Sequence, residues 1–327
     1  MSIGLGACSD TRPPSSRGTS TATGEPTAVA SWKTGLTDAP TPRLEVASAV
    51  VGDLLYVAGG LSPSGASNVV ETYDPDANTW RQGPKLPIAL HHAMGVAWRK
   101  TFVVLGGFTT NDFSTPSARV FSLQGDAWTE LPAMRRARAA GGAAVAGNTI
   151  VVVGGQDGAR LVTETERYDG ERWTDGAPIP TPRDHLGVAA IGSSVYALAG
   201  RSLTIDSTLS TFERYDVATN RWTDLAEPRT ARGGFAFVAL EDRLVALGGE
   251  GPTKDAGSDG VFEAVEVFRV ASGRWERLPA DMPRPRHGLG AGVIDGTIYT
   301  AVGGPRAGGS YTQALDGLRI VTGVRAQ

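Results

Sequence analysis

Cysteine is almost absent from this chain, since its 327 residues contain only Cys8. A single cysteine excludes an internal disulfide. Also missing is any run of about 18–20 apolar residues, the length that a membrane-spanning helix requires. Neither sign of charge is in excess, because 31 Lys and Arg stand against 34 Asp and Glu, a formal net charge of -3. Electrostatics therefore give no basis for nucleic-acid binding.

The first 30 residues differ in composition from the rest of the chain. Residues 9–26 are rich in Ser, Thr, Pro, Gly and Arg, which predicts a flexible tether. Directly before it, Leu5-Gly6-Ala7-Cys8 resembles the bacterial lipobox, whose cysteine becomes the lipidated first residue. Only seven residues precede Cys8, too few for a basic segment plus an apolar segment of about 7–15 residues. We expect a lipidated Cys8 and an extracytoplasmic protein if the true start lies upstream. If the match is accidental, we expect an exposed thiol on a cytoplasmic protein.

Tryptophan gives the strongest sign of organisation. Six of the seven tryptophans recur at steps of 48, 48, 45, 49 and 53 residues: Trp32, Trp80, Trp128, Trp173, Trp222 and Trp275. A pair of small residues after an apolar run keeps the same period: Gly59-Gly60, Gly106-Gly107, Gly154-Gly155, Ala199-Gly200, Gly248-Gly249 and Gly303-Gly304. A self-similar unit of about fifty residues indicates a repeat architecture.

Residues 43–87 show what one repeat contains. Short apolar runs at 46–51 and 54–58 are separated by Gly52-Asp53, a tight-turn dipeptide. After Gly59-Gly60 come a polar loop, a run at 69–73, a turn at 74–78 and a short segment around Trp80. Four short strands joined by tight turns predict one antiparallel blade of a β-propeller. Parallel pairing is excluded because a crossover needs about a dozen residues or more.

The order of apolar run, small-residue pair, aromatic residue and tryptophan resembles the kelch repeat. In five copies an aromatic residue stands seven residues before the tryptophan, or five in the third copy: Tyr73, Phe121, Tyr168, Tyr215 and Phe268. The resemblance covers roughly residues 31–322. It implies an all-β fold, a six-bladed β-propeller with four antiparallel strands per blade. The aromatic residues and tryptophans are then expected to fill the space between neighbouring blades.

The two ends of the repeat array are out of phase. Trp32 precedes any first-strand signal, whereas the last copy has a third strand at 315–321 but no tryptophan. We therefore expect the N-terminal strand to complete the sixth blade, which would remove two exposed sheet edges. The chain then divides into a tether, residues 1–30, and a propeller, residues 31–327.

Arginine recurs near the start of each predicted first strand. Counting back 16 residues from the small-residue pair gives Arg43, Leu90, Arg138, Arg183 and Arg232, and counting back 17 in the last copy gives Arg286. An acid stands two residues before the third-strand aromatic in four of the copies with the arginine, and Asp316 matches in the sixth, whereas the second copy has Leu90 and Arg119 instead. This joint loss is what a buried ion pair predicts, because a stranded buried charge costs about 3–5 kcal/mol. The predicted structural pairs are Arg43 with Glu71, Arg138 with Glu166, Arg183 with Glu213, Arg232 with Glu266, and Arg286 with Asp316.

One rim of the propeller is expected to collect the groups that bind or titrate. All four histidines follow the arginine ring within two residues: His91, His92, His185 and His287. In kelch propellers generally, groups just inside the first strand and just after the small-residue pair point toward the channel mouth. Carried over, these positions are Glu45, His92, His185, Gln156, Arg201 and Glu250. We predict a ligand or peptide site there, with affinity changing between about pH 5.5 and 7.5 as unperturbed histidines titrate.

No metal or other cofactor is predicted. Histidines suit Zn or Cu, but these lie on different repeats without His-x-His or Cys-x-x-Cys spacing. The copper radical oxidases among kelch propellers need a cysteine crosslinked to a tyrosine, and here no cysteine follows Cys8.

Two classes of function fit the repeat. The first is a non-enzymatic, monomeric binding module whose partner is a protein, a peptide or a small polar carbohydrate. The alternative is an enzyme of the kelch mutarotase type, similar to bacterial N-acetylneuraminate epimerases, using Glu45, Glu250, Arg201 and His185 on a sugar acid. A deep channel with a carboxylate beside an arginine would favour the enzyme, and a shallow mouth with no perturbed acid would favour the binder.

Overall fold

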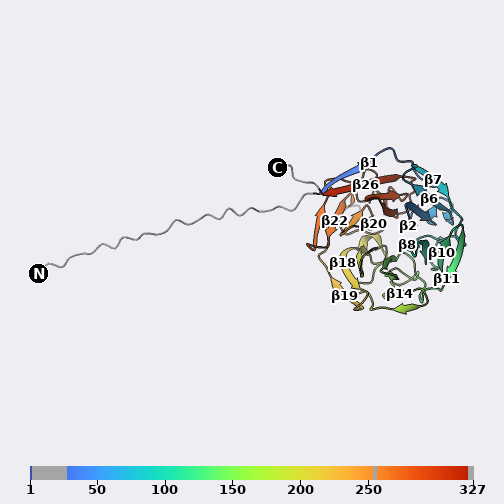
Figure 1. Cartoon of the computed structure of the whole chain (residues 1–327), viewed down its shortest axis with the longest axis horizontal. Helices are drawn as coiled ribbons and strands as arrows, with labels where there is room; N and C mark the ends of the chain where they lie inside the picture. The colour runs from blue at the N-terminus through green and yellow to red at the C-terminus, as the bar shows by residue number, and fades with distance from the viewer. Residues whose placement is uncertain (2–27, 253–255, 323–327) are drawn as a thin grey trace.

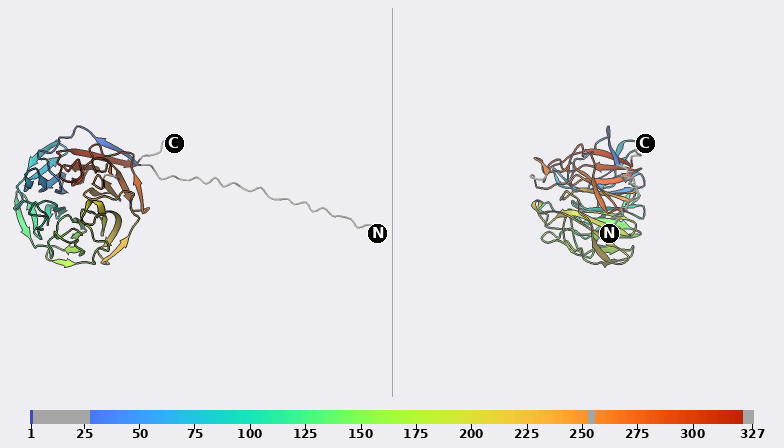
Figure 2. Two further views of the ribbon diagram at one scale, coloured as in Figure 1. Left: turned by 180° about the vertical axis from the view of Figure 1, so that it is seen from behind. Right: turned by 90° about the vertical axis from the view of Figure 1, so that its left-hand side faces the viewer.

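Six four-stranded antiparallel sheets surround a central axis like the blades of a propeller (Figures 1 and 2). This computed structural model describes residue 1, residues 28–252 and residues 256–322. Of the predicted tether, residues 1–30, only Met1 and residues 28–30 belong to the described part of the chain. Cys8 lies outside it. In the described part of the chain, no helix is both long and apolar enough to span a lipid bilayer.

Each blade runs from an innermost strand at the axis to an outermost strand at the edge. Blade 1 contains β2 (Ala47–Val51), β3 (Leu54–Ala58), β6 (Val70–Asp74) and β7 (Thr79–Gln82). Blade 2 contains β8 (Met94–Trp98), β9 (Thr101–Leu105), β10 (Val120–Gln124) and β11 (Ala127–Leu131). Blade 3 contains β12 (Gly142–Ala146), β13 (Thr149–Val153), β14 (Glu166–Tyr168) and β15 (Trp173–Asp175).

The other three blades follow the same order. Blade 4 contains β16 (Gly187–Ile191), β17 (Ser194–Arg201), β18 (Thr208–Asp216) and β19 (Arg221–Asp224). Blade 5 contains β20 (Ala236–Leu240), β21 (Arg243–Leu247), β22 (Val265–Arg269) and β23 (Arg274–Arg277). Blade 6 contains β24 (Gly290–Ile294), β25 (Thr297–Ala301), β26 (Leu315–Thr322) and β1 (Ala28–Lys33). The predicted all-β, six-bladed fold is confirmed.

Two connections hold more structure than the sequence predicted. The loop after Gly59-Gly60 forms a short hairpin of β4 (Leu61–Ser62) and β5 (Gly65–Ala66). In blade 4, β17 and β18 continue past Leu198 with a shift of register and are joined by a 3-10 turn, η1 (Ile205–Ser207). The β4–β5 hairpin and Arg201, the last residue of β17, line the same pocket.

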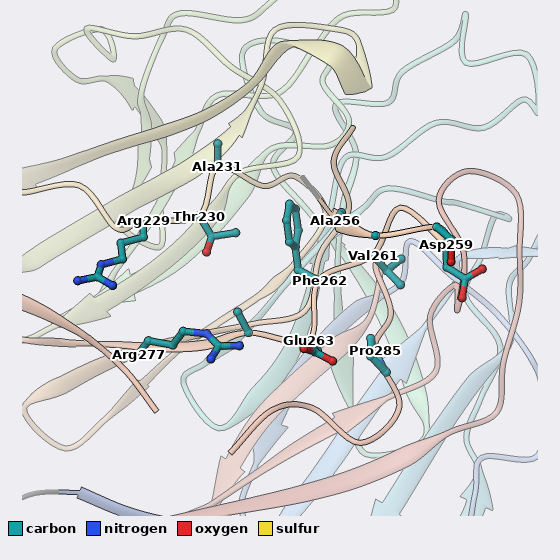
Figure 3. Close-up of a pocket in the computed structure, with 13 residues that line it drawn as sticks. Arg229, Thr230, Ala231, Ala256, Asp259, Val261, Phe262, Glu263, Arg277 and Pro285 are labelled. Carbon is teal, nitrogen blue, oxygen red and sulfur yellow. The ribbon is translucent and has the colours of Figure 1, made fainter. Parts of the chain in front are cut away.

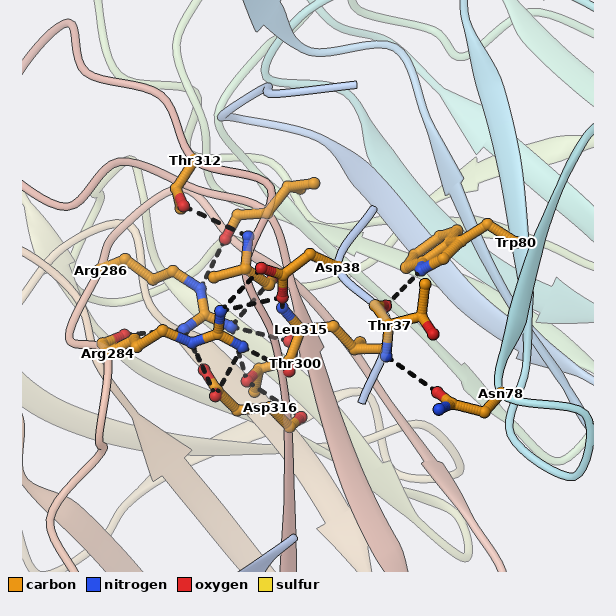
Figure 4. A network of polar contacts seen from close by, with 12 residues as sticks. Thr37, Asp38, Asn78, Trp80, Arg284, Arg286, Thr300, Thr312, Leu315 and Asp316 are labelled. Carbon is orange, nitrogen blue, oxygen red and sulfur yellow. Dashed lines mark hydrogen bonds and ion pairs between the residues drawn. The ribbon is translucent and has the colours of Figure 1, made fainter. Parts of the chain in front are cut away.

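The N-terminal strand closes the ring as predicted. β1 pairs antiparallel with β26, with Trp32 opposite Leu318. β1 begins at Ala28, three residues before the predicted boundary at residue 31, because Ala28 and Val29 extend the same ladder. Beyond β1, Asp38 accepts hydrogen bonds from Arg284 Nη1 and Leu315 N, both at 2.9 Å (Figure 4). The sixth blade is thus tied to the segment that leads into the first.

The six periodic tryptophans share one contact. Each sits on the outermost strand of its blade, and its indole N–H donates to a backbone carbonyl on the linker that brings the chain into that blade. For Trp80 the acceptor is Thr37 O at 2.8 Å (Figure 4). The other acceptors belong to Ala280 for Trp32, Pro84 for Trp128, Pro132 for Trp173, Ala177 for Trp222 and Ala226 for Trp275. The tryptophans are therefore periodic because each blade uses one of them to bind the linker that enters it.

The five predicted ion pairs are all present and buried. Guanidinium–carboxylate distances are 2.7 Å for Arg43 with Glu71, 2.6 Å for Arg138 with Glu166, and 2.5 Å for both Arg183 with Glu213 and Arg286 with Asp316. Arg232 pairs with Glu266 in the same way. In blade 2, Leu90 fills the buried position and Arg119 instead pairs with Glu130 at the surface. The arginines are structural, and they are not available to a ligand.

The structure corrects the spacing in the last blade. Arg286 Nε donates to Val302 O, as Arg183 Nε donates to Ala199 O in blade 4. Val302 and Gly303 also carry the two positive φ angles, 54° and 110°, that mark the small-residue pair elsewhere. The structural pair is therefore Val302-Gly303 and the spacing is 16 residues in all six blades. At Gly106, a Cβ would lie 2.4 Å from Arg138 O, which explains why glycine holds this position there.

Candidate functional site at the channel mouth

One residue from each blade forms a closed ring of backbone hydrogen bonds around the channel. Each N–H in the ring donates to the carbonyl of the member before it, at distances of 2.6–2.9 Å. All six residues have a left-handed backbone with φ between 53° and 59°. The members are Glu45, His92, Ala140, His185, Gly234 and Gly288.

Three of these six residues carry large side chains in a conformation that favours glycine. A left-handed backbone at a residue other than glycine costs on the order of 1–3 kcal/mol. Glycine occupies the equivalent position in blades 5 and 6, so the geometry does not require the side chains of Glu45, His92 and His185. Retention of charged or titratable groups at strained positions is typical of binding and catalytic sites.

A second layer of side chains lies against the ring and is held together by Arg201. Its Nη1 donates to Glu250 Oε1 at 2.6 Å, and its Nη2 donates to His185 Nε2 at 2.8 Å. Asp184 accepts from His185 Nδ1 and, at 2.9 Å, from the Leu203 backbone N–H. An aspartate, a histidine, an arginine and a glutamate thus form a continuous polar chain across blades 4 and 5.

Glu45 lies at the centre of the remaining groups. Its Oε2 is 3.6 Å from His92 Nε2, and its Oε1 is 3.6 Å from His287 Nδ1. His287 Nδ1 is also 3.4 Å from Glu250 Oε2. We call the seven residues Glu45, His92, Asp184, His185, Arg201, Glu250 and His287 the mouth cluster. All have side chains that are at most 15% exposed.

Five residues of the mouth cluster form the floor of a pocket of about 570 Å³. Glu45, His92, Arg201, Glu250 and His287 belong to its lining, and the walls include the β4–β5 hairpin, Phe113 and Tyr311. Phe113 is 40% exposed, so the wall offers an apolar surface beside the charged floor. Below the floor, a narrower space of about 120 Å³ is bounded by the hydrogen-bonded ring itself.

A larger hollow of about 780 Å³ lies elsewhere, beside blade 5 (Figure 3). Its lining includes Arg229, Arg277, Glu263 and Phe262. None of the six predicted rim residues belongs to this lining. The mouth pocket is therefore the better candidate, because it alone of the two contains the cluster of perturbed titratable groups.

Comparison with known proteins assigns the repeat. Residues 91–304 match the KLHDC2/KLHL20/DRC7 Kelch-repeats domain, and residues 42–87 match the Kelch motif. The chain belongs to the kelch-repeat family.

Similar proteins are longer than the part that aligns with this chain. Kelch-like protein terF of Aspergillus terreus is 30% identical over 84% of this chain and 64% of that protein. Human Kelch-like protein 34 is 26% identical over 80% of this chain and 43% of that protein. Kelch repeat protein M-T8 of Myxoma virus is 29% identical over 64% of this chain and 42% of that protein. The chain thus spans between about two fifths and two thirds of the length of these relatives.

The solved structure of YjhT has the same fold. It superposes with a TM-score of 0.72 at 15% identity, covering 86% of this chain and 95% of that chain. At this identity the likeness concerns the fold alone.

Five of the six predicted rim residues of this kelch propeller converge on the mouth pocket. Glu45, His92, Arg201 and Glu250 belong to its lining, and His185 contacts Arg201 beneath it. Gln156 is outside that lining and bridges Ala139 within blade 3. Whether any of the six binds a ligand stays a prediction.

Asp184 and His287 belong to the mouth cluster, although neither is among the six predicted site residues. Each directly precedes a ring position and forms a bridge to the residue after the small-residue pair of its own kelch repeat, Asp184 with Arg201 and His287 with Gly304. The residue before each ring position was therefore a third set to consider. Asp184 and His287 are equivalent positions, because each directly follows the buried arginine of its blade.

Burial and neighbouring charges set the protonation of the kelch site. Burial alone would raise the pKa of Glu45, but nearby His92 and His287 outweigh it and hold that pKa well below its usual range. Burial lowers the pKa of His92 well below 6.5 despite the charge of Glu45. Burial also lowers the pKa of His91. For His287, burial is outweighed by Glu45 and Glu250, so its pKa is raised. The premise of unperturbed histidines is therefore wrong for these three.

The histidines of the kelch site are expected to titrate on opposite sides of pH 6.5. In a two-dimensional NMR titration of the imidazole resonances, His287 should lose its proton above that value, whereas His92 should stay neutral until well below it. His287 then contributes stability that is present below its unfolded pKa and lost as pH rises through its folded pKa. The contribution of His92 to stability has the opposite pH dependence. Stability is lost as pH falls below the unfolded pKa of His92, because the unfolded state then binds a proton and the folded state does not. Coincident titration of both near 6.5 would contradict this assignment.

Proposed function

We propose that this kelch propeller is a non-enzymatic interaction module that takes a polar segment of a partner protein or peptide into its mouth pocket. The observation that carries the proposal is the strained backbone of Glu45, His92 and His185 in the hydrogen-bonded ring. Their left-handed conformation destabilises the fold, whereas glycine would not. A function for the three side chains accounts for their presence.

The pocket is suited to a segment that offers both charge and apolar surface. Arg201 is 15% exposed and belongs to the lining of the pocket. Phe113 and Tyr311 stand on the walls, and aromatic residues with arginine are the groups that most often dominate the energy of protein interfaces. The floor is preorganised by the backbone ring, so binding orders few groups that were free before.

We further propose that the protein is a monomer tethered to the cell envelope through Cys8. The monomer is supported by the few large apolar side chains exposed in the described part of the chain: Met1, Val29, Phe113, Leu203 and Val321. Tethering is supported by the lipobox-like Leu5-Gly6-Ala7-Cys8 before a low-complexity segment.

A second candidate function is catalysis on a sugar acid, of the mutarotase type. One observation favours it: Arg201 stands 2.6 Å from the buried Glu250, the carboxylate beside an arginine that such an enzyme needs. The pKa of Asp184 is lowered as well, since His185, Arg201 and the Leu203 N–H outweigh its burial. Accelerated exchange of the N-acetylneuraminate anomers, measured by NMR and lost in Glu250→Gln, would support this function in place of the first.

The interaction function is tested with a matched pair of double variants. Peptides selected on an array with the wild-type protein are titrated against it by fluorescence anisotropy. The double variant Phe113→Ala with Arg201→Gln should weaken binding by about tenfold or more, since each substitution removes a side chain that anchors the partner in the pocket.

Asp53→Ala with Asp242→Ala is the control, because these residues occupy the β2–β3 and β20–β21 turns on the opposite face. Unchanged affinity is expected there. Loss of binding in the turn pair alone, or full affinity in the rim pair, would refute a site at the mouth.

A further inference from the structure

We propose that Glu45, Glu250 and His287 bind a divalent transition-metal ion such as Zn²⁺, and that His92, whose Nε2 faces the second carboxylate oxygen of Glu45, becomes a fourth ligand after a side-chain movement. This goes beyond the proposed interaction function and does not depend on it. These residues come from blade 1, blade 2 and the linkers at blades 5 and 6. They are therefore far apart in the sequence and form no short motif.

The hydrogen-bond partners of His287 determine which of its nitrogens is free. Its Nε2 faces two backbone carbonyls, Gly308 O at 3.0 Å and Arg306 O at 3.1 Å, which only accept. Nε2 therefore carries the hydrogen, and in the neutral ring Nδ1 is a lone pair. That atom is buried without a hydrogen-bond partner among the described residues, in a side chain that is 2% exposed. It faces the carboxylates of Glu45 and Glu250. Because a lone pair and two carboxylates repel one another, a proton or a metal ion between them would stabilise the arrangement.

His92 is oriented by the same logic. His91 Nε2 faces Thr110 O at 3.0 Å and so carries a hydrogen, which leaves its Nδ1 as an acceptor in the neutral ring. His92 Nδ1 lies 2.6 Å from that acceptor and donates to it. The lone pair of His92 is therefore on Nε2, which is 3.6 Å from Glu45 Oε2. Metal-binding histidines in proteins typically have their second nitrogen fixed by such a partner.

The distances between these atoms fit one ion. Zinc bonds of about 2.0–2.1 Å in a tetrahedron place neighbouring ligand atoms about 3.3–3.4 Å apart. Here His287 Nδ1 is 3.4 Å from Glu250 Oε2 and 3.6 Å from Glu45 Oε1. All three ligand atoms of this set lie within 4.8 Å of one another. The groups are already spaced for coordination and need only small side-chain adjustments.

A second group, Glu45 with His92 and His185, also lies within 4.8 Å but is less suitable. Arg201 Nη2 donates to His185 Nε2 at 2.8 Å and so occupies the lone pair that an ion would need. On Glu250, in contrast, Arg201 occupies Oε1 and leaves Oε2 facing His287.

The charge of the mouth cluster also fits a divalent cation. Glu45, Asp184 and Glu250 contribute three negative charges and Arg201 one positive charge, so with neutral histidines the sum is -2. A divalent ion balances it. Two carboxylates with imidazole nitrogen are a donor set that zinc accepts.

The test uses the metal alone and the full chain carrying Cys8→Ser, because a free thiol would bind zinc by itself. Isothermal titration with Zn²⁺ should show one ion per chain. Glu45→Gln and His287→Gln, which keep size and polarity, should each weaken binding by about 100-fold or more, since even the loss of a residue that only orients a metal ligand costs about 10–100-fold.

His185→Gln is the matched control and should retain zinc affinity within about threefold. The unprotonated Nε2 of His185 already accepts a hydrogen bond from Arg201 and is not expected to bind the ion. Loss of zinc binding in His185→Gln but not in His287→Gln would overturn the assignment. So would the absence of stoichiometric binding by the Cys8→Ser protein. A measurement independent of variant folding is the visible spectrum with Co²⁺, where the bands of a four-coordinate nitrogen–oxygen site are expected and a purely aqueous spectrum refutes the proposal.

Discussion

Replacing Arg138 by methionine should lower the free energy of unfolding by about 3–5 kcal/mol. Both side chains of the Arg138 and Glu166 pair are 0% exposed, so the change leaves a buried carboxylate without its counter-charge. It also removes the hydrogen bonds from Nη1 to Gly154 O and Glu164 O. Urea denaturation followed by tryptophan fluorescence measures the difference.

The matched control is Arg119→Met in blade 2. Arg119 and Glu130 form an ion pair of similar length, 2.7 Å, but their side chains are 42% and 47% exposed. An exposed pair contributes about 0–1 kcal/mol. Equal losses in the two variants would show that burial does not determine the importance of these pairs. A double variant, Arg138→Leu with Glu166→Gln, should recover part of the stability, because no isolated charge remains buried.

A chain that begins at residue 35, and so lacks β1, should fail to form a stable propeller. The deletion removes six strand residues paired with β26 and the indole of Trp32, which packs with the core shared by blades 5 and 6. Lost hydrogen bonds of about 1 kcal/mol each and a lost aromatic side chain add up to on the order of 5 kcal/mol or more. Total stabilities of domains are only about 5–15 kcal/mol.

A chain that begins at residue 28 is the control and should keep wild-type stability and remain monomeric, as gel filtration and urea denaturation would show. A synthetic peptide of residues 28–36, added to the shorter chain, should restore part of the lost stability by rebuilding the β1–β26 ladder. Equal stability of the two shortened chains would mean that blade 6 is complete with three strands.

The periodic residues of the sequence predicted the architecture because each has the same contact in every blade. Trp80 and its five equivalents bond one linker each, and the ion pairs recur wherever the arginine recurs. For the same reason, the absence of the arginine and its acid from blade 2 could be recognised in the sequence. Repetition thus made the fold and the structural arginines predictable from spacing.

The mouth cluster was only partly predictable, because its residues differ from blade to blade. His287 was left out of the predicted site because it directly precedes a ring position, and only ring positions were carried over from the first strand. Asp184 was missed because only its neighbour His185 matched a rim position. The expectation of no metal was based on ligand spacing along the sequence, and the proposed metal ligands Glu45, Glu250 and His287 meet only when the ring closes.

The pairing of Ala28 with Thr322 determines how the propeller responds to mechanical load. Both ends of the described strands leave blade 6 at the same corner, so a force applied between them opens the β1–β26 ladder one residue pair at a time. Peeling of this kind requires less force than sliding two strands past each other, because the hydrogen bonds break singly. It would proceed through Ala30 and Ser31 until it reached Trp32, whose indole is held by Ala280 O at 3.2 Å. A load at the termini therefore meets its first side-chain anchor only after four residues have been released.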